Sequence, residues 1–171
     1  RRRQHFTDVV MASDSDGWAV GARGAVFQTR DQGLSWQALP ELKEKESELL
    51  LGQLDFQSAA TTETKLWAAG KPGSCLVSVD KQSGAVNIHP TPITSALTRV
   101  TFASETHGWA VGDLGIIIAT TDGGQTWQIQ RGKQTRVGLL SVCFDAAELP
   151  LELLAEYACE DDVLCGTVGM T

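Results

Sequence analysis

Tyrosine occurs once in 171 residues, and no run approaches the roughly 18 apolar residues that mark a membrane-spanning helix. The 14 Lys and Arg are outnumbered by 21 Asp and Glu, and the net charge of −7 argues against general affinity for nucleic-acid phosphate. The 4 cysteines and 3 histidines show no C-x-x-C or clustered zinc spacing. We therefore expect no membrane span, no nucleic-acid partner, no metal and no cofactor.

Glycine and tryptophan are abundant by comparison. The chain has 17 Gly and 5 Trp, and its hydrophobic content of 42% can form the core of one ordinary domain. Many glycines with regularly placed aromatic residues indicate short strands joined by tight turns, which is an all-β pattern. This composition excludes a disordered chain and a coiled coil.

The chain contains an internal repeat. The pentapeptide Gly-Trp-Ala-Val-Gly occurs at 17–21 and again at 108–112, and without a gap 11 of the 21 residues in 17–37 match those in 108–128. A diverged copy, Leu-Trp-Ala-Ala-Gly at 66–70, lies between them, so the period is about 45 residues. Four short strands per copy, joined by Gly-containing turns, are typical of a β-propeller blade.

We therefore predict an all-β fold, a β-propeller of four-stranded antiparallel blades, with about three and a half blades in this chain. The expected blades are 5–40, a diverged second blade at 49–90, a third at 97–132 and a partial fourth at 138–171. Pro150 and the apolar spacing that follows it predict one helical insertion over 148–158 in the fourth blade. A partial blade leaves strand edges unpaired, so self-association through open blade edges is expected.

The joint between the third and fourth strands fits S/T-x-D-x-G-x-S/T-W, the Asp-box, in the first and third copies. The residues of this motif are Thr29, Asp31, Gly33, Ser35, Trp36, Thr120, Asp122, Gly124, Thr126 and Trp127. The motif predicts a local structure in which the carboxylate accepts backbone N–H bonds, the glycine is left-handed and the tryptophan packs inward. All five tryptophans are accordingly expected to be buried between or within blades.

The middle copy keeps only part of the motif. Ser78, Asp80 and Gly84 are present, but one residue is inserted and Asn87-Ile88 stands where the tryptophan is expected. An altered hairpin is predicted there.

Several residues also have a functional interpretation. Asp31 and Asp122 would be the carboxylates of a glycosidase, although a structural role in hairpin turns is favoured and no catalytic residue is predicted. Blade turns emerge on common faces of a propeller, so four arginines are candidates for one partner-binding patch, with solvated surface as the alternative: Arg23, Arg30, Arg99 and Arg131. Cys159 and Cys165 are either bridged or buried thiols.

The two strong copies, Gly-Trp-Ala-Val-Gly followed by Thr-x-Asp-x-Gly-x-Ser/Thr-Trp, resemble Asp-box (BNR-type) β-propellers, and most closely the photosystem II assembly and stability factor family. The resemblance covers about residues 5–132. It implies a non-catalytic scaffold that binds a protein partner after export to the periplasm, the thylakoid lumen or the exterior, with the export signal not present in this chain.

The same class of repeat leaves two alternatives open. One is a fragment of a secreted sialidase-like or other glycan-acting hydrolase. Sialidases use a tyrosine nucleophile, and the only tyrosine, Tyr157, falls in the predicted helix, which argues against this alternative. The other is an architectural repeat of a large exported protein.

Overall fold

The computed structural model describes residues 5–39, 53–130, 138–140 and 142 and shows three four-stranded sheets. The first sheet comprises β1 (Phe6–Met11), β2 (Gly17–Gly21), β3 (Val26–Thr29) and β4 (Gln37–Ala38), with the 3-10 turn η1 (Ala22–Gly24) between β2 and β3. The second comprises β5 (Asp55–Thr61), β6 (Lys65–Lys71), β7 (Cys75–Asp80) and β8 (Val86–Pro90). The third comprises β9 (Leu97–Phe102), β10 (Gly108–Gly112), β11 (Ile117–Thr120) and β12 (Gln128–Ile129), with η2 (Asp113–Gly115) between β10 and β11.

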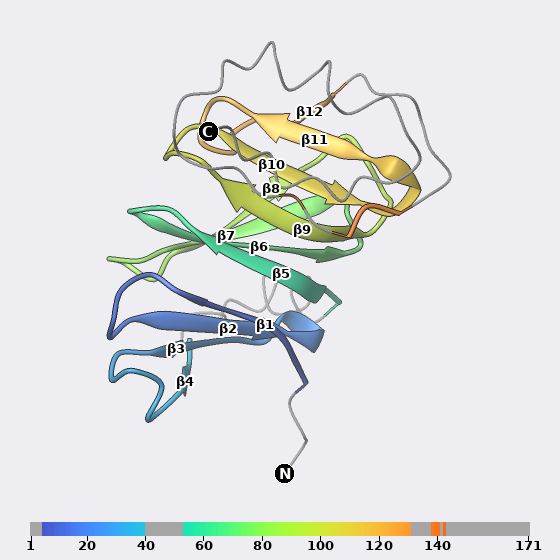
Figure 1. Ribbon diagram of the computed structural model, residues 1–171. Coiled ribbons are helices and arrows are strands. Elements are labelled where there is room, and N and C mark those ends of the chain that lie inside the picture. The colour runs from blue at the N-terminus through green and yellow to red at the C-terminus, as the bar shows by residue number, and fades with distance from the viewer. Residues whose placement is uncertain (1–4, 40–52, 131–137, 141, 143–171) are drawn as a thin grey trace, which may run out of the picture.

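Each sheet is an antiparallel meander in which consecutive strands pair. The sheets stack face to face, with the first at the bottom of Figure 1, the second in the middle and the third at the top. The first strands β1, β5 and β9 contact one another in turn, so they form the inner edge of the stack. This arrangement is that of consecutive propeller blades, and the predicted all-β propeller fold is confirmed.

Two apolar clusters fill the spaces between the blades. The first lies between the first and second sheets, where Trp18 and Val20 meet Phe56 and Leu66. The second lies between the second and third sheets around Trp67, which has no exposed surface. A single sheet could not bury both of its faces, so this stacking supplies most of the core.

Glycine at the end of each second strand allows the blade to form. A Cβ atom added to Gly21 would lie 2.0 Å from the His5 carbonyl oxygen, and one added to Gly112 would lie 2.0 Å from that of Ala96. In both places the inner strand bulges next to the glycine, between Phe6 and Asp8 in the first sheet. The repeated pentapeptide therefore ends on glycine because the neighbouring backbone passes too close for a side chain.

The predicted fourth blade at 138–171 and its helix at 148–158 fall almost entirely outside the described residues. Gly138–Leu140 is described, and the Leu139 amide donates to the Gly112 carbonyl at 3.0 Å. Within the described ranges the molecule has no helix long and apolar enough to cross a membrane.

Candidate functional site: blade turns and the inner strands

The turn between β3 and β4 is held by hydrogen bonds to Asp31. Asp31 Oδ1 accepts the Ser35 amide at 2.8 Å and the Thr29 hydroxyl at 2.8 Å, and its Oδ2 accepts the Ser35 hydroxyl at 2.6 Å. The Gly33 amide donates to Thr29 Oγ1 at 2.9 Å, and Gly33 itself has φ +84°. The carboxylate and the left-handed glycine thus close the turn on itself.

The turn between β11 and β12 has the same bonds in the third blade. Asp122 accepts the Thr126 amide at 2.9 Å, the Thr126 hydroxyl at 2.6 Å and the Thr120 hydroxyl at 2.8 Å. Bonds from Thr126 and Thr120 lower the Asp122 pKa to about 2, and the equivalent bonds from Ser35 and Thr29 lower the pKa of Asp31. Hydrogen bonds to the charged form have this effect, so both groups are carboxylates at neutral pH.

Asp31 and Asp122 do not form a facing catalytic pair. They belong to the first and third sheets, and β5 of the second sheet contacts the inner strands of both. A glycosidase needs two carboxyl groups on either side of one bond, with one of them protonated. Two separated carboxylates, each already accepting three bonds from its own turn, suit a structural role in hairpin closure.

The tryptophans of the two turns differ in burial. Trp127 is 5% exposed and packs against Trp67 and Phe102, with ring centroids 6.2 and 6.0 Å away. Trp36 is 36% exposed, and its Nε1–H donates to the Gly33 carbonyl at 3.1 Å. The expectation that all five tryptophans are buried is therefore wrong for Trp36, because within the described residues no sheet packs on its side of the first blade.

That side of the first blade is an uncovered apolar face. Phe6, Val9 and Met11 of β1 are 45%, 58% and 46% exposed. Phe6 also packs edge-on against Phe27 at 5.1 Å between ring centroids. In the third blade the residues 91 positions later, Leu97, Val100 and Phe102, are in or packed against the core between the second and third sheets. We call Phe6, Val9, Met11, Phe27 and Trp36 the free face of the first blade.

The second blade has an altered turn. Asp80 Oδ1 accepts the Ser83 amide at 2.7 Å, the Ser83 hydroxyl at 2.8 Å and the Gln82 amide at 3.1 Å, and the Ser83 bonds lower the Asp80 pKa. Asn87 pairs with Ser78 as Gln128 pairs with Ala119 in the third blade. The residue before it, Val86, therefore occupies the register position of Trp127. The prediction of an altered hairpin agrees with this geometry, but the prediction that Asn87-Ile88 stands at the tryptophan position is wrong, because Val86 occupies it.

Three equivalent positions on the inner strands connect neighbouring blades. Asp8, Ser58 and Arg99 each follow the bulge of their strand and pair with Val20, Ala69 and Val111 respectively. Asp8 Oδ2 accepts the Ala59 amide at 2.9 Å, and the Val100 amide donates to Ser58 Oγ at 3.3 Å. Asp8 and Ser58 therefore each bond to the next blade.

Arg99 occupies the third of these positions. Its Nη1 lies 3.7 Å from Asp8 Oδ2, and its side chain is 45% exposed. The ion pair joins the inner strands of the first and third blades across the inner edge of the second. Arg99 is one of the four arginines predicted for a partner-binding patch. Asp8 is not predicted, although the two positions are 91 residues apart, which is the offset of the repeat.

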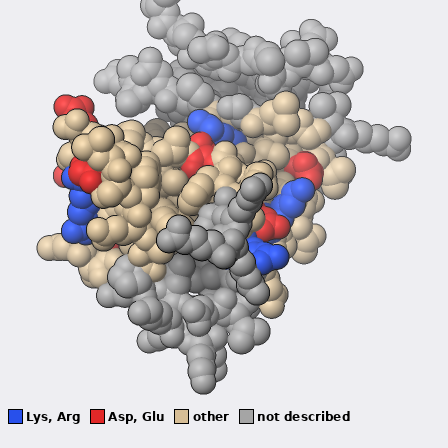
Figure 2. Space-filling model, turned by 90° about the horizontal axis from the view of Figure 1, so that it is seen from below, with Lys and Arg blue, Asp and Glu red and all other residues tan. Residues whose placement is uncertain are grey.

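The candidate arginines do not come together. Arg23 lies in η1, at one end of the first sheet, whereas Arg30 follows β3 at the opposite end, and Arg99 is on the inner strand β9. Arg131 lies outside the described residues. Seen from below the first blade, blue Lys and Arg atoms appear in separate places, each beside red Asp or Glu atoms (Figure 2).

No group of three or more His, Cys, Asp or Glu side chains suitable for a metal occurs among the residues that the structure describes. Cys75 is a free, half-buried thiol whose pKa is raised by burial. Cys159 and Cys165 lie outside the described ranges, so their pairing stays a prediction.

The fold and these turns define the chain as a segment of a β-propeller built from repeated Asp-containing hairpins. Comparison with known proteins identifies the family to which the chain belongs. The model of the family described as photosynthesis system II assembly factor YCF48 matches residues 2–89 and 83–150. The chain belongs to this family.

Solved structures agree on the fold. YCF48 bound to a D1 peptide superposes with a TM-score of 0.65 at 17% identity, covering 77% of this chain and 41% of that one. YCF48 from Cyanidioschyzon merolae gives a TM-score of 0.57 at 22% identity, covering 74% and 40%. An ancestral GH74 enzyme gives a TM-score of 0.54 at 14% identity, covering 72% of this chain and 18% of the enzyme. The chain thus spans about two fifths of the YCF48 structures. No curated protein sequence matches it.

Proposed function

We propose that the chain is part of a non-catalytic propeller that binds a protein partner during photosystem II assembly. Membership of the YCF48 family carries this proposal, and the structure of YCF48 with a D1 peptide supports a peptide as the partner. The turn carboxylates support the absence of catalysis by this segment, because Asp31 and Asp122 are engaged in their own turns. The likeness to the GH74 enzyme concerns the fold alone.

The peptide-binding residue that we propose is Arg99, on the inner strand of the third blade. Its side chain is 45% exposed, and within the described residues it forms an ion pair with Asp8. A peptide carboxylate or carbonyl could therefore replace or share this contact, since guanidinium donates several hydrogen bonds in a fixed fork. Arg23 and Arg30 lie at opposite ends of the first sheet and would meet different parts of a partner.

The experiment is an isothermal titration calorimetry measurement in which this chain is titrated with the D1 peptide. Arg99→Ala should weaken binding by about tenfold or more, as loss of a charged contact does. Lys71→Ala, which removes an exposed cation at the end of β6, is the matched control and should change the affinity less than twofold. Equal affinity for the original chain and Arg99→Ala would contradict the assignment of Arg99, and absence of binding would contradict the proposed partner.

We further propose that the ten motif residues at 29–36 and 120–127 act as structural Asp-boxes. The protein works after export, in the thylakoid lumen or the periplasm, as the family resemblance implies. The free face of the first blade is covered in the working protein by another blade, and in the isolated chain it drives self-association, because exposed apolar sheet faces and edges recruit further chains.

A further inference from the structure

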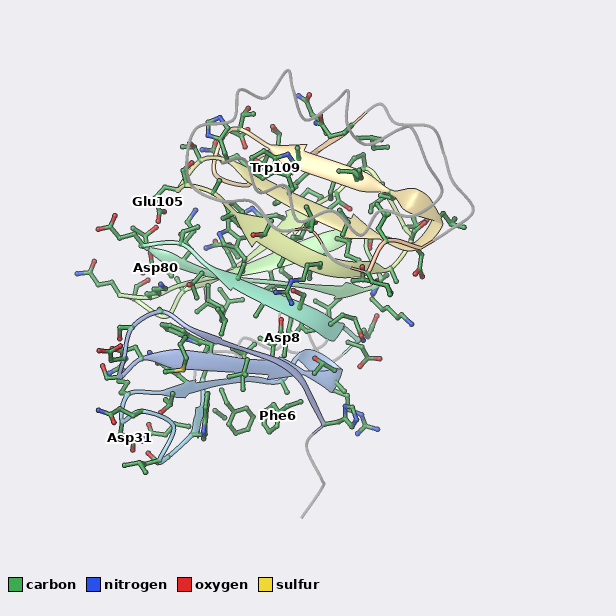
Figure 3. The ribbon with its side chains drawn as sticks, viewed as in Figure 1. Phe6, Asp8, Asp31, Asp80, Glu105 and Trp109 are labelled. Atoms are coloured by element: carbon green, nitrogen blue, oxygen red, sulfur yellow. The ribbon has the colours of Figure 1, made fainter. Side chains whose placement is uncertain are left out.

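A furrow lies at the end of the sheets that carries the Asp31 and Asp80 turns. Its first two parts lie between the first and second blades, and its third part lies between the second and third blades, next to Ala12 of the first. It consists of three adjoining hollows of about 460, 450 and 490 Å³. Lys81 lines all three, Trp18 and Arg30 line the first two, and Glu63 lines the last two. The furrow extends from Gln37 and Ala38 on the outer strand to Glu105 on the turn between β9 and β10. Figure 3 labels Asp31, Asp80 and Glu105 along this edge of the molecule.

The altered turn of the second blade lies beside the first hollow, which Asp80, Gln82, Ser83 and Gly84 line. Between the second and third blades, Trp127 fills the equivalent wedge against Trp67. Between the first and second blades, Val86 stands in that register position and packs on the cluster around Trp18. Valine lacks the indole ring, and Trp18 of the first blade lines the first hollow together with Val79 and Gly84 of the second.

The charges of the furrow favour a cationic partner. Among the residues that the structure describes, five carboxylates line the furrow against two cations, Arg30 and Lys81; the carboxylates belong to Asp16, Asp31, Glu63, Asp80 and Glu105. Lys81 is already engaged, because its Nζ donates to the Thr62 carbonyl and lies 5.2 Å from the centre of the Trp18 ring. Asp31, Asp80 and Glu105 also accept hydrogen bonds from neighbouring residues, but these bonds leave their charge in place, so the furrow keeps a net negative charge.

The polar walls of the furrow suit an extended backbone. Gln28, Gln37 and Gln82 contribute side-chain amides along the first hollow. An amide offers both donors and an acceptor, which matches the alternating groups of a peptide chain. We propose that the furrow binds an extended, Arg- or Lys-containing segment of a partner protein. This surface is separate from Arg99 on the inner strands and does not depend on the proposed D1-like partner.

Fluorescence anisotropy with two labelled peptides tests the proposal. The probe is an octapeptide of alternating Arg and Gly, and the same octapeptide with Glu in place of Arg is the comparison. The chain should bind the Arg peptide and bind the Glu peptide at least tenfold more weakly. Absence of binding by the Arg peptide, or tighter binding of the Glu peptide, would overturn the inference.

Two substitutions distinguish the furrow from general attraction to an acidic protein. Glu63→Lys changes an exposed furrow residue and should weaken binding of the Arg peptide at least tenfold. Asp113→Lys makes the same charge change in η2, at the opposite end of the third sheet, and should change it less than twofold. Equal weakening by both would overturn the assignment to the furrow.

A third variant tests the shape of the site. Val86→Trp places the larger side chain where Trp127 lies in the third blade, so it should fill the space beside Trp18 and weaken the Arg peptide at least fivefold. Unfolding in urea, measured alongside, shows whether the variant folds. Unchanged affinity in a folded Val86→Trp chain would contradict the proposed position of the peptide.

Discussion

The first and third blades have closely related sequences but different neighbours. Their turns make the same bonds to the carboxylate, with the Ser35 hydroxyl 2.6 Å from Asp31 and the Thr126 hydroxyl 2.6 Å from Asp122. Yet Trp36 is 36% exposed, while Trp127 is 5% exposed. Sequence-local bonds therefore determine the turn, whereas the burial of its tryptophan depends on whether another blade packs against it.

The largest difference is expected from the two tryptophans. Trp127→Ala removes a ring packed on Trp67 and Phe102 and should lower the free energy of unfolding by about 3–5 kcal/mol. Trp36→Ala removes a ring from the free face of the first blade and should cost about 1 kcal/mol. Urea unfolding measures both. Equal costs would show that the tryptophan acts within its own turn.

The two glycines of the turns provide a second comparison. Gly33 and Gly124 have φ +84° and +80°, so an alanine at either position should cost about 1–2 kcal/mol in backbone strain. A Cβ at Gly124 would also lie 2.0 Å from the Trp67 ring, whereas one at Gly33 would lie 3.9 Å from its nearest neighbour. Gly124→Ala should therefore cost about 1–3 kcal/mol more than Gly33→Ala, from overpacking. Equal losses in thermal unfolding would argue against close packing of the second and third blades.

Acid should affect the two turns alike, because the bonds to the carboxylates are the same. The Asp122 pKa is lowered from 3.8 to about 2, so its contribution to stability is complete above pH 3.8 and is lost as the pH falls toward 2. Asp122→Asn should flatten this part of the pH profile of the melting temperature, and Asp31→Asn should do so in the same direction. A profile that both variants leave unchanged would contradict the bonding described for the turns.

The smallest effect on stability is expected at the free face of the first blade. Val9 is 58% exposed, so Val9→Lys should change the free energy of unfolding of the monomer by less than about 0.5 kcal/mol. The same variant should reduce self-association, because it places a charge on the face proposed to recruit another chain. Leu114→Lys, on a residue that is also 58% exposed but lies in η2, is the matched control. Light scattering at several concentrations measures both; equal association would contradict the role of this face.

Local patterns predicted the blades and their turns from the sequence. The spacing of Asp, Gly and Ser or Thr determines a hairpin through bonds over four residues, and these need no distant partner. The two glycine-ended pentapeptides likewise reflect a close approach of adjacent strands within one blade. Such features lie within a single repeat, so one sequence is enough to recognise them.

Features that depend on neighbouring blades were predicted less well. The exposure of Trp36 depends on what covers the first blade, which its motif does not encode. Val86 was missed as the counterpart of Trp127 because the motif pattern aligns Ser78 with Thr120. The strand pairing instead places Val79 at the position of Thr120, so this alignment is wrong by one residue. The separation of Arg23 from Arg30 is predictable from the sequence, because successive turns of a meander lie at opposite ends of the sheet. The predicted basic patch did not take strand direction into account.

The most direct test of the central claim uses fluorine NMR on chain labelled with 5-fluorotryptophan. Five resonances are expected for the 5 tryptophans, and Trp→Phe substitutions assign them. The protein concentration is kept in the range where light scattering shows a monomer. The soluble radical TEMPOL is then added, and it broadens the resonances of tryptophans that are exposed to solvent. Our account predicts strong broadening for Trp36 and little for Trp127. Equal broadening of the two would contradict it, because burial would then follow from the shared motif and not from the neighbouring blade.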